Sequence, residues 1–183
     1  MGRQRTAFYE HGLTKYVGAK SISVGYADVK WFSLSELDVS GRGIRQSAVN
    51  FCTRENVVFG TVAQSPGGRT DQRILRVKAL TTAAIAARME KELAERKSTD
   101  WVVGQDNQPA LELRADGVTV TKSSTFVPFS DLKLSTRNGQ FFLSNPAAHI
   151  FEGSCGMDNF YPGLAVLEKR LGKTEGYRRE VRE

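Results

Sequence analysis

Two stretches of the chain are loose copies of each other, and this duplication limits what the chain can fold into. Tyr9-Glu10-His11-Gly12-Leu13 opens the first copy, and Arg114-Ala115-Asp116-Gly117-Val118 opens the second. Tyr26-Ala27-Asp28-Val29-Lys30 then matches Phe129-Ser130-Asp131-Leu132-Lys133, at an offset of 103 residues rather than 105. Each copy ends in a segment with helical periodicity. We therefore expect one strand-rich unit, closed by a helix, to be used twice.

Short runs of alternating or β-branched residues, separated by turn-forming residues, dominate the first copy and are typical of strands. Seven strands are predicted there: Ala7–Tyr9, Leu13–Val17, Ser21–Gly25, Val29–Val39, Ala48–Cys52, Val57–Val62 and Ile74–Val77. The period then changes, because Ile85, Met89 and Leu93 recur every four residues. This spacing predicts a helix from Thr81 or Thr82 to about Lys97.

The second copy repeats this order in fewer residues, with seven further strand candidates between Trp101 and Glu152. Asp158 is expected to cap a helix that Gly172 ends. The apolar stripe of that helix consists of Phe160, Leu164, Leu167 and Leu171. The predicted fold is mainly β (α+β), with a first unit at 6–99, a second and more compact unit at 100–172, and a charged tail at 173–183.

Seven short strands followed by one amphipathic helix resemble a pleckstrin-homology-like (PH-like) domain, in which the helix closes one end of a bent β-sandwich or barrel. The duplicated elements resemble an uncharacterised bacterial family with two such domains in tandem. Its pattern corresponds in the first copy to Tyr9, His11, Gly12, Leu13, Tyr26, Asp28 and Val29, and in the second to Asp116, Gly117, Val118, Phe129, Asp131 and Leu132. The resemblance covers about residues 6–172.

Positive charge is concentrated in the first copy. Residues 1–100 contain 16 Lys and Arg against 10 Asp and Glu, a net charge of +6, whereas residues 101–183 contain 10 of each kind. Cations that converge can bind phosphate, anionic lipid or an acidic protein, although a solvated surface is the alternative. The predicted anion-binding residues are Lys15, Lys20, Arg42, Arg45, Arg69, Arg73 and Arg76. Basic residues on early strands bind inositol phosphates in some PH domains, which suggests that role for Lys15 and Lys20.

The two cysteines, Cys52 and Cys155, are 103 residues apart and neither lies in a C-x-x-C pair. No zinc framework or disulfide scaffold is predicted, and a reducing cytoplasm is the expected setting. A thiol close to a helix N-terminus can become reactive, so a thiol-dependent enzyme that uses Cys155, with His149 six residues before it, is an alternative.

The preferred hypothesis is a non-enzymatic binding or scaffolding module. Its first unit is expected to engage a protein partner or an anionic surface, such as the inner face of a membrane. Self-association into a homo-oligomer is the alternative within the same class. No cofactor, metal or specific nucleic acid is predicted.

Overall fold

A computed structural model describes residues 4–39, 43–102, 108–172 and 180–182, and these residues form a mainly β protein with two α-helices. The chain divides into two compact units, Met1–Ile85 and Ala86–Glu183. The division falls inside the first α-helix, so each unit contains part of that helix. The predicted domains 6–99 and 100–172 remain a prediction.

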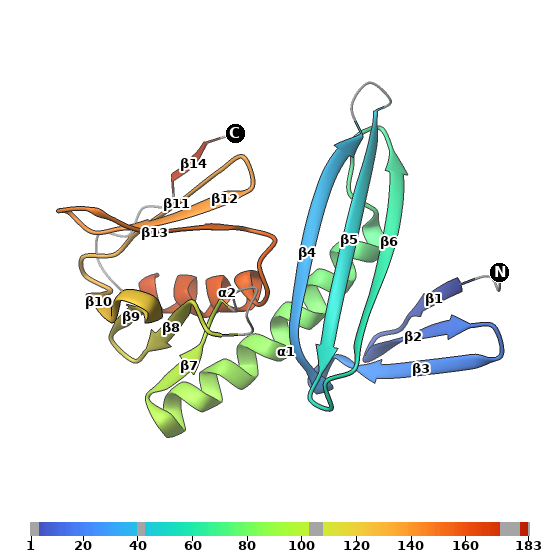
Figure 1. The fold of residues 1–183 in the computed structure, drawn as a ribbon, viewed down its shortest axis with the longest axis horizontal. Helices are drawn as coiled ribbons and strands as arrows, with labels where there is room; N and C mark the ends of the chain where they lie inside the picture. The colour runs from blue at the N-terminus through green and yellow to red at the C-terminus, as the bar shows by residue number, and fades with distance from the viewer. Residues whose placement is uncertain (1–3, 40–42, 103–107, 173–179, 183) are drawn as a thin grey trace. The chain divides into compact units, whose positions relative to one another are not determined.

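The first unit contains two three-stranded antiparallel sheets, each a meander of consecutive strands (Figure 1). A short 3-10 helix, η1 (Tyr26–Asp28), connects the two sheets, and α1 (Gln72–Arg96) follows the second. The strands are β1 (Gln4–Phe8), β2 (Gly12–Val17) and β3 (Lys20–Gly25) in one sheet, and β4 (Val29–Val39), β5 (Ile44–Thr53) and β6 (Val58–Pro66) in the other. Within the described residues, neither sheet closes into a barrel.

The second unit also has two sheets, each of four strands. Along the chain, α2 (Phe160–Leu171) comes after seven of these eight strands and before the eighth. The first sheet consists of β7 (Ser98–Asp100), β8 (Leu111–Arg114), β9 (Gly117–Val120) and β10 (Thr125–Pro128). Its strands lie in the order β10-β9-β8-β7. The second sheet follows it along the chain. That sheet contains β11 (Lys133–Arg137), β12 (Gln140–Ser144) and β13 (His149–Ser154), with β14 (Glu180–Arg182) parallel to β11.

Backbone hydrogen bonds confirm that the duplicated sequence elements are structurally equivalent. The Tyr26 N–H donates to the His11 carbonyl at 3.0 Å, and the Phe129 N–H donates to the Asp116 carbonyl at the same distance. The Val29 N–H donates a hydrogen bond to the Tyr26 carbonyl, and the Leu132 N–H donates one to the Phe129 carbonyl. Asp28 and Asp131 therefore occupy matching turns, each between two meanders of its own unit.

A glycine begins β2 in the first unit and β9 in the second, because no side chain fits there. A Cβ on Gly12 would lie 2.2 Å from the Val24 carbonyl oxygen, and one on Gly117 would lie 2.3 Å from that of Val127. Gly12 pairs with Gly25, and Gly117 pairs with Pro128, at the same place in both meanders. Both units thus have glycine in the repeated motif because the backbone of the neighbouring strand lies too close for a side chain.

The core of the first unit lies between its sheets and the first half of α1. Phe32 and Phe51 are cross-strand partners on β4 and β5, both buried, and their rings stack with centroids 6.3 Å apart. α1 contributes a buried stripe at Ile74, Val77, Thr81 and Ile85.

The core of the second unit is centred on Trp101, which is fully buried. Its indole N–H donates to the Phe160 carbonyl at 3.1 Å, and its ring lies over Gly163, where a Cβ would come within 1.8 Å of it. Phe141 packs beside both Trp101 and Phe160, with ring centroids 6.0 and 4.6 Å away. The second half of α1 adds the buried side chains of Met89 and Leu93.

The mainly β class and the two helices are confirmed, but three local predictions are wrong. The strand candidate that begins at Trp101 is misplaced, because β7 ends at Asp100 and neither Trp101 nor Val102 belongs to a strand. Ile74–Val77 is the beginning of α1 rather than a seventh strand, because Ile74 and Val77 continue the helical stripe of Thr81 and Ile85. The residue that caps α2 is Asn159, in the left-handed region at φ 58°, rather than Asp158. Gly172 does end α2, as expected.

Replacing either repeated glycine by alanine should destabilise its own unit. Gly12→Ala and Gly117→Ala each force a methyl group against a backbone carbonyl, and overpacking of this kind costs about 1–3 kcal/mol. Urea unfolding followed by circular dichroism measures the loss, with Ser21→Ala, at an exposed strand position, as the control. Unchanged stability in both glycine variants would contradict the close backbone approach, and a loss in only one of them would contradict the structural equivalence.

Leu167→Ala should lower the free energy of unfolding by about 2–5 kcal/mol, because it removes a buried side chain and leaves a cavity. Leu167 is completely buried on α2, whereas the control, Leu37→Ala, changes a side chain that is 64% exposed. Urea melts of both variants test this contrast. Equal stabilities would mean that the stripe of α2 does not pack in the core.

Candidate ligand-binding groove

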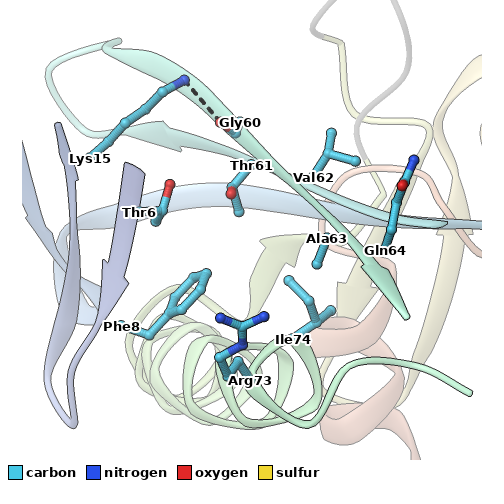
Figure 2. Close-up of a pocket in the computed structure, with 10 residues that line it drawn as sticks. All are labelled: Thr6, Phe8, Lys15, Gly60, Thr61, Val62, Ala63, Gln64, Arg73 and Ile74. Carbon is cyan, nitrogen blue, oxygen red and sulfur yellow. Dashed lines mark hydrogen bonds between the residues drawn. The ribbon is translucent and has the colours of Figure 1, made fainter. Parts of the chain in front are cut away.

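A pocket of about 520 Å³ lies in the first unit, between the first meander, β6 and the beginning of α1 (Figure 2). Thr6 and Phe8 of β1 line one side, and the run Gly60–Gln64 of β6 lines the other. Lys15 of β2 and the pair Arg73 and Ile74 of α1 complete the lining. We call this pocket the first-unit groove. Its volume is within the range of small-ligand sites, and its lining contains two cations and no carboxylate.

Lys15 spans the groove from one sheet to the other. Its half-buried side chain crosses from β2, and its Nζ donates a hydrogen bond to the Gly60 carbonyl of β6 at 3.0 Å (Figure 2). A neutral carbonyl satisfies one ammonium donor but does not balance the charge. A partly desolvated ammonium is stabilised more strongly by an anion, so Lys15 is suited to bind one.

Arg73, the other cation of the groove, is paired with Asp71. The Asp71 carboxylate accepts hydrogen bonds from the Arg73 side chain at 2.6 and 3.0 Å, and from the Arg73 backbone N–H at 2.8 Å. The last contact is that of an N-cap residue at the beginning of α1. The hydrogen bonds from Arg73 hold the pKa of Asp71 below its usual value. Asp71 therefore fixes the helix start and neutralises Arg73.

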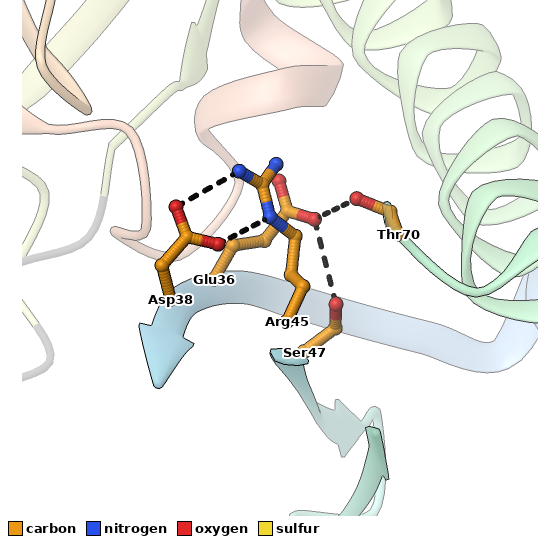
Figure 3. Close-up of polar contacts among 5 residues, drawn as sticks. All are labelled: Glu36, Asp38, Arg45, Ser47 and Thr70. Atoms are coloured by element: carbon orange, nitrogen blue, oxygen red, sulfur yellow. Dashed lines mark hydrogen bonds and ion pairs between the residues drawn. The ribbon is translucent and has the colours of Figure 1, made fainter. Parts of the chain in front are cut away.

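Arg45 forms an ion pair with a carboxylate outside the groove. It lies opposite Asp38 on neighbouring strands and donates to both carboxylate oxygens, at 2.9 and 3.1 Å (Figure 3). This bond lowers the pKa of Asp38. Beside it, Glu36 accepts hydrogen bonds from Ser47 and Thr70 (Figure 3). The cluster connects the β4–β5 pair to the segment that leads into α1.

The remaining predicted anion-binding residues do not line the first-unit groove. Lys20, Arg69 and Arg76 are exposed, on β3, in the loop before α1 and on α1. Burial raises the pKa of the Tyr26 phenol, and the charge of Arg76 partly opposes this shift. Arg42 lies outside the described residues. Of the predicted set, the structure thus brings Lys15 and Arg73 to one pocket.

The second unit has apolar residues at the positions that match the groove. Thr6 pairs with Lys15 across β1 and β2, and the equivalent cross-strand pair on β8 and β9 is Leu111 with Val120. Leu111 and Val120 are both buried, whereas Thr6 and Lys15 are only partly so. The same strand pair thus carries a buried apolar pair of residues in the second unit and a polar, partly exposed pair in the first.

The thiol and the imidazole proposed for an enzyme are not brought together. His149 begins β13 and Cys155 directly follows its end. An extended strand rises about 3.3 Å per residue, so the two residues are roughly 20 Å apart. Among the described residues, no three His, Cys, Asp or Glu side chains gather where a metal ion could bind. No described helix has the length and apolarity needed to cross a bilayer.

No family model matches the chain, and a search of curated proteins finds no match. The resemblance to tandem PH-like proteins therefore remains a prediction.

Sequence reasoning identified Lys15 and Arg73 but missed the residues that make a groove around them. Thr6 and Phe8 are about 50 residues from the β6 run, and neither stretch has an unusual local sequence. One signal was present in the duplication. Aligning the copies at their shared glycine places Lys15 against Val120, a change from charged to apolar at one strand position.

Asp71→Asn should destabilise the protein at neutral pH but not in strong acid. Asparagine still caps a helix, so this variant removes mainly the charge that pairs with Arg73. Since folding lowers the pKa of Asp71, its charge stabilises the fold above the unfolded-state pKa of about 3.9, and this contribution is lost as pH falls through the folded-state pKa. Urea melts between neutral and acidic pH measure the difference.

Asp71→Ala is the matched comparison, because it removes the cap as well. A further loss of about 1 kcal/mol relative to Asp71→Asn is expected at every pH. A wild-type advantage over Asp71→Asn that is independent of pH would contradict the proposed role of the charge.

Proposed function

We propose that this protein is a non-enzymatic binding module made of two PH-like units, in which the first unit binds an anionic partner in the first-unit groove. The observation that carries the proposal is the contrast between Thr6–Lys15 and Leu111–Val120 at one structurally equivalent strand pair. Burying an apolar pair stabilises a domain, so a polar pair at the same place favours a role other than stability.

Lys15 is the residue expected to contact the anion. It is half-buried, its described hydrogen bond goes to a neutral carbonyl, and no carboxylate lines the groove around it. The net charge of +6 in the first copy attracts anions over longer distances and speeds their encounter with the groove. Local recognition and long-range attraction thus favour the same class of partner.

An anionic membrane surface is the second candidate, supported by the exposed cations Lys20, Arg69 and Arg76. A flat surface attracts charge wherever it is exposed and does not need a groove. The two candidates therefore differ in which lysine matters, Lys15 or Lys20.

Lys15→Val should weaken binding of an anionic ligand about tenfold or more, since a charge-assisted hydrogen bond contributes about 1.5–3 kcal/mol. Lys20→Val is the matched control, because it removes the same charge from an exposed site on the same sheet. Fluorescence anisotropy with labelled hexaglutamate, and sedimentation with vesicles of phosphatidylcholine and phosphatidylglycerol, measure binding at low and high salt. Thr6→Leu with Lys15→Val installs the apolar pair of the second unit and should abolish hexaglutamate binding while preserving the fold.

Equal losses in Lys15→Val and Lys20→Val would show that only net charge matters, and vesicle binding with that pattern would favour the membrane surface. Absence of binding to every anionic probe would overturn the proposed function. Because screening shortens from about 10 Å at 0.1 M salt to about 3 Å at 1 M, the contribution of the distant cations should fade in high salt while that of Lys15 persists.

A further inference from the structure

β6 is an edge strand that carries no charged residue along its whole length. It forms one side of the β4-β5-β6 sheet and pairs only with β5 among the described strands. Its sequence, Val58–Pro66, is VFGTVAQSP. An edge strand leaves alternate backbone N–H and C=O groups unpaired, and proteins usually protect such edges with charges, bulges or covering segments. β6 has a proline at its end but is otherwise unprotected by its own side chains.

The edge also exposes apolar side chains. Val58 and Val62 are 63% and 59% exposed, and the part from Gly60 to Gln64 lies along the first-unit groove. Lys15 reaches this edge from the other sheet and donates to the Gly60 carbonyl, as an edge-protecting lysine does. The groove therefore combines a free strand edge, an apolar floor that includes Phe8 and Ile74, and a cation at the edge itself.

We infer that the partner of the first-unit groove is an extended segment of an acidic protein, which adds to β6 as a new strand along Gly60–Gln64. Backbone hydrogen bonds to the free edge give affinity, and an aspartate or glutamate side chain of the segment pairs with Lys15. Five residues of β6 correspond to about 17 Å of extended chain, enough for several such bonds. This inference rests on the proposed function and names the class of its ligand.

Charge complementarity selects this occupant over a second copy of the chain. β6 contains no acidic residue, so a β6–β6 pair would leave Lys15 without an anion. A free phosphate or a lipid headgroup satisfies Lys15 but leaves the strand edge unpaired. An extended acidic segment satisfies both.

Pools of short peptides test the inference with the full-length protein. One pool has a central glutamate flanked by random Thr, Val, Ser and Ile, a second has glutamine in its place, and a third is the glutamate pool with N-methylated backbone amides. The immobilised protein should retain the glutamate pool about tenfold more than the glutamine pool, and N-methylation should remove retention. On peptide binding, amide hydrogen exchange should slow along Gly60–Gln64.

Two variants on the same strand localise the site. Val62→Asp places a repelling charge in the groove and should abolish retention, whereas Val58→Asp changes an equally exposed valine that does not line it and should retain the pool. Circular dichroism of both variants checks that the fold is preserved.

The outcomes separate this inference from the proposed function. Equal retention of the N-methylated pool, or retention of no pool while hexaglutamate still binds through Lys15, overturns strand addition and leaves the proposed function standing. Loss of Lys15-dependent binding to every anionic probe overturns both. Sedimentation velocity that shows a dimer disrupted by Val62→Asp assigns the edge to a second copy and overturns the inference.

Discussion

In each unit, the close approach of two neighbouring strands at one glycine sets the path of the chain on which the rest of the unit depends. Gly12 and Gly117 begin β2 and β9 so close to the next strand that a single methyl group would collide with its carbonyl. The residue just before each glycine accepts the hydrogen bond that fixes where the chain leaves the first meander. The second meander and the helix follow from that exit point, and this explains why the motif is kept in both copies although neighbouring residues differ.

The two units differ in the residues that they place at one equivalent strand pair. The second unit buries Leu111 and Val120, and full burial of a Leu or Val side chain contributes about 1.5–3 kcal/mol. The first unit has Thr6 and Lys15 there and gains much less from burial. Duplication makes such a division possible, since one copy can contribute stability while the other keeps an accessible, less stable surface.

Most strands of both units and the apolar stripes of both helices were predictable from sequence, because each is a local periodic signal, and the duplication was predictable because its two motifs repeat at nearly the same offset. The strands β7 and β14 are only three residues each, too short to give such a signal. The run Ile74–Val77 is ambiguous in sequence because a short apolar run fits a strand and a helix equally, and the contact that decides for a helix is the cap at Asp71. The groove was not predictable from charge alone. Arg45 is paired because Asp38 lies opposite it in the folded sheet, whereas Lys15 contacts a neutral carbonyl of another sheet, and neither contact can be inferred from charge in the sequence.

The partners of each cation distinguish Lys15 from the arginines of the first unit. Arg45 and Arg73 are matched with carboxylates, so an incoming anion would have to compete with bonds that already exist. Exposed cations are well hydrated and their attraction is screened by salt. Lys15 is partly desolvated and bonded to a neutral oxygen that belongs to a strand edge. An anion that pairs with Lys15 would release that carbonyl, and the extended segment that we propose would supply the carbonyl with a new backbone donor.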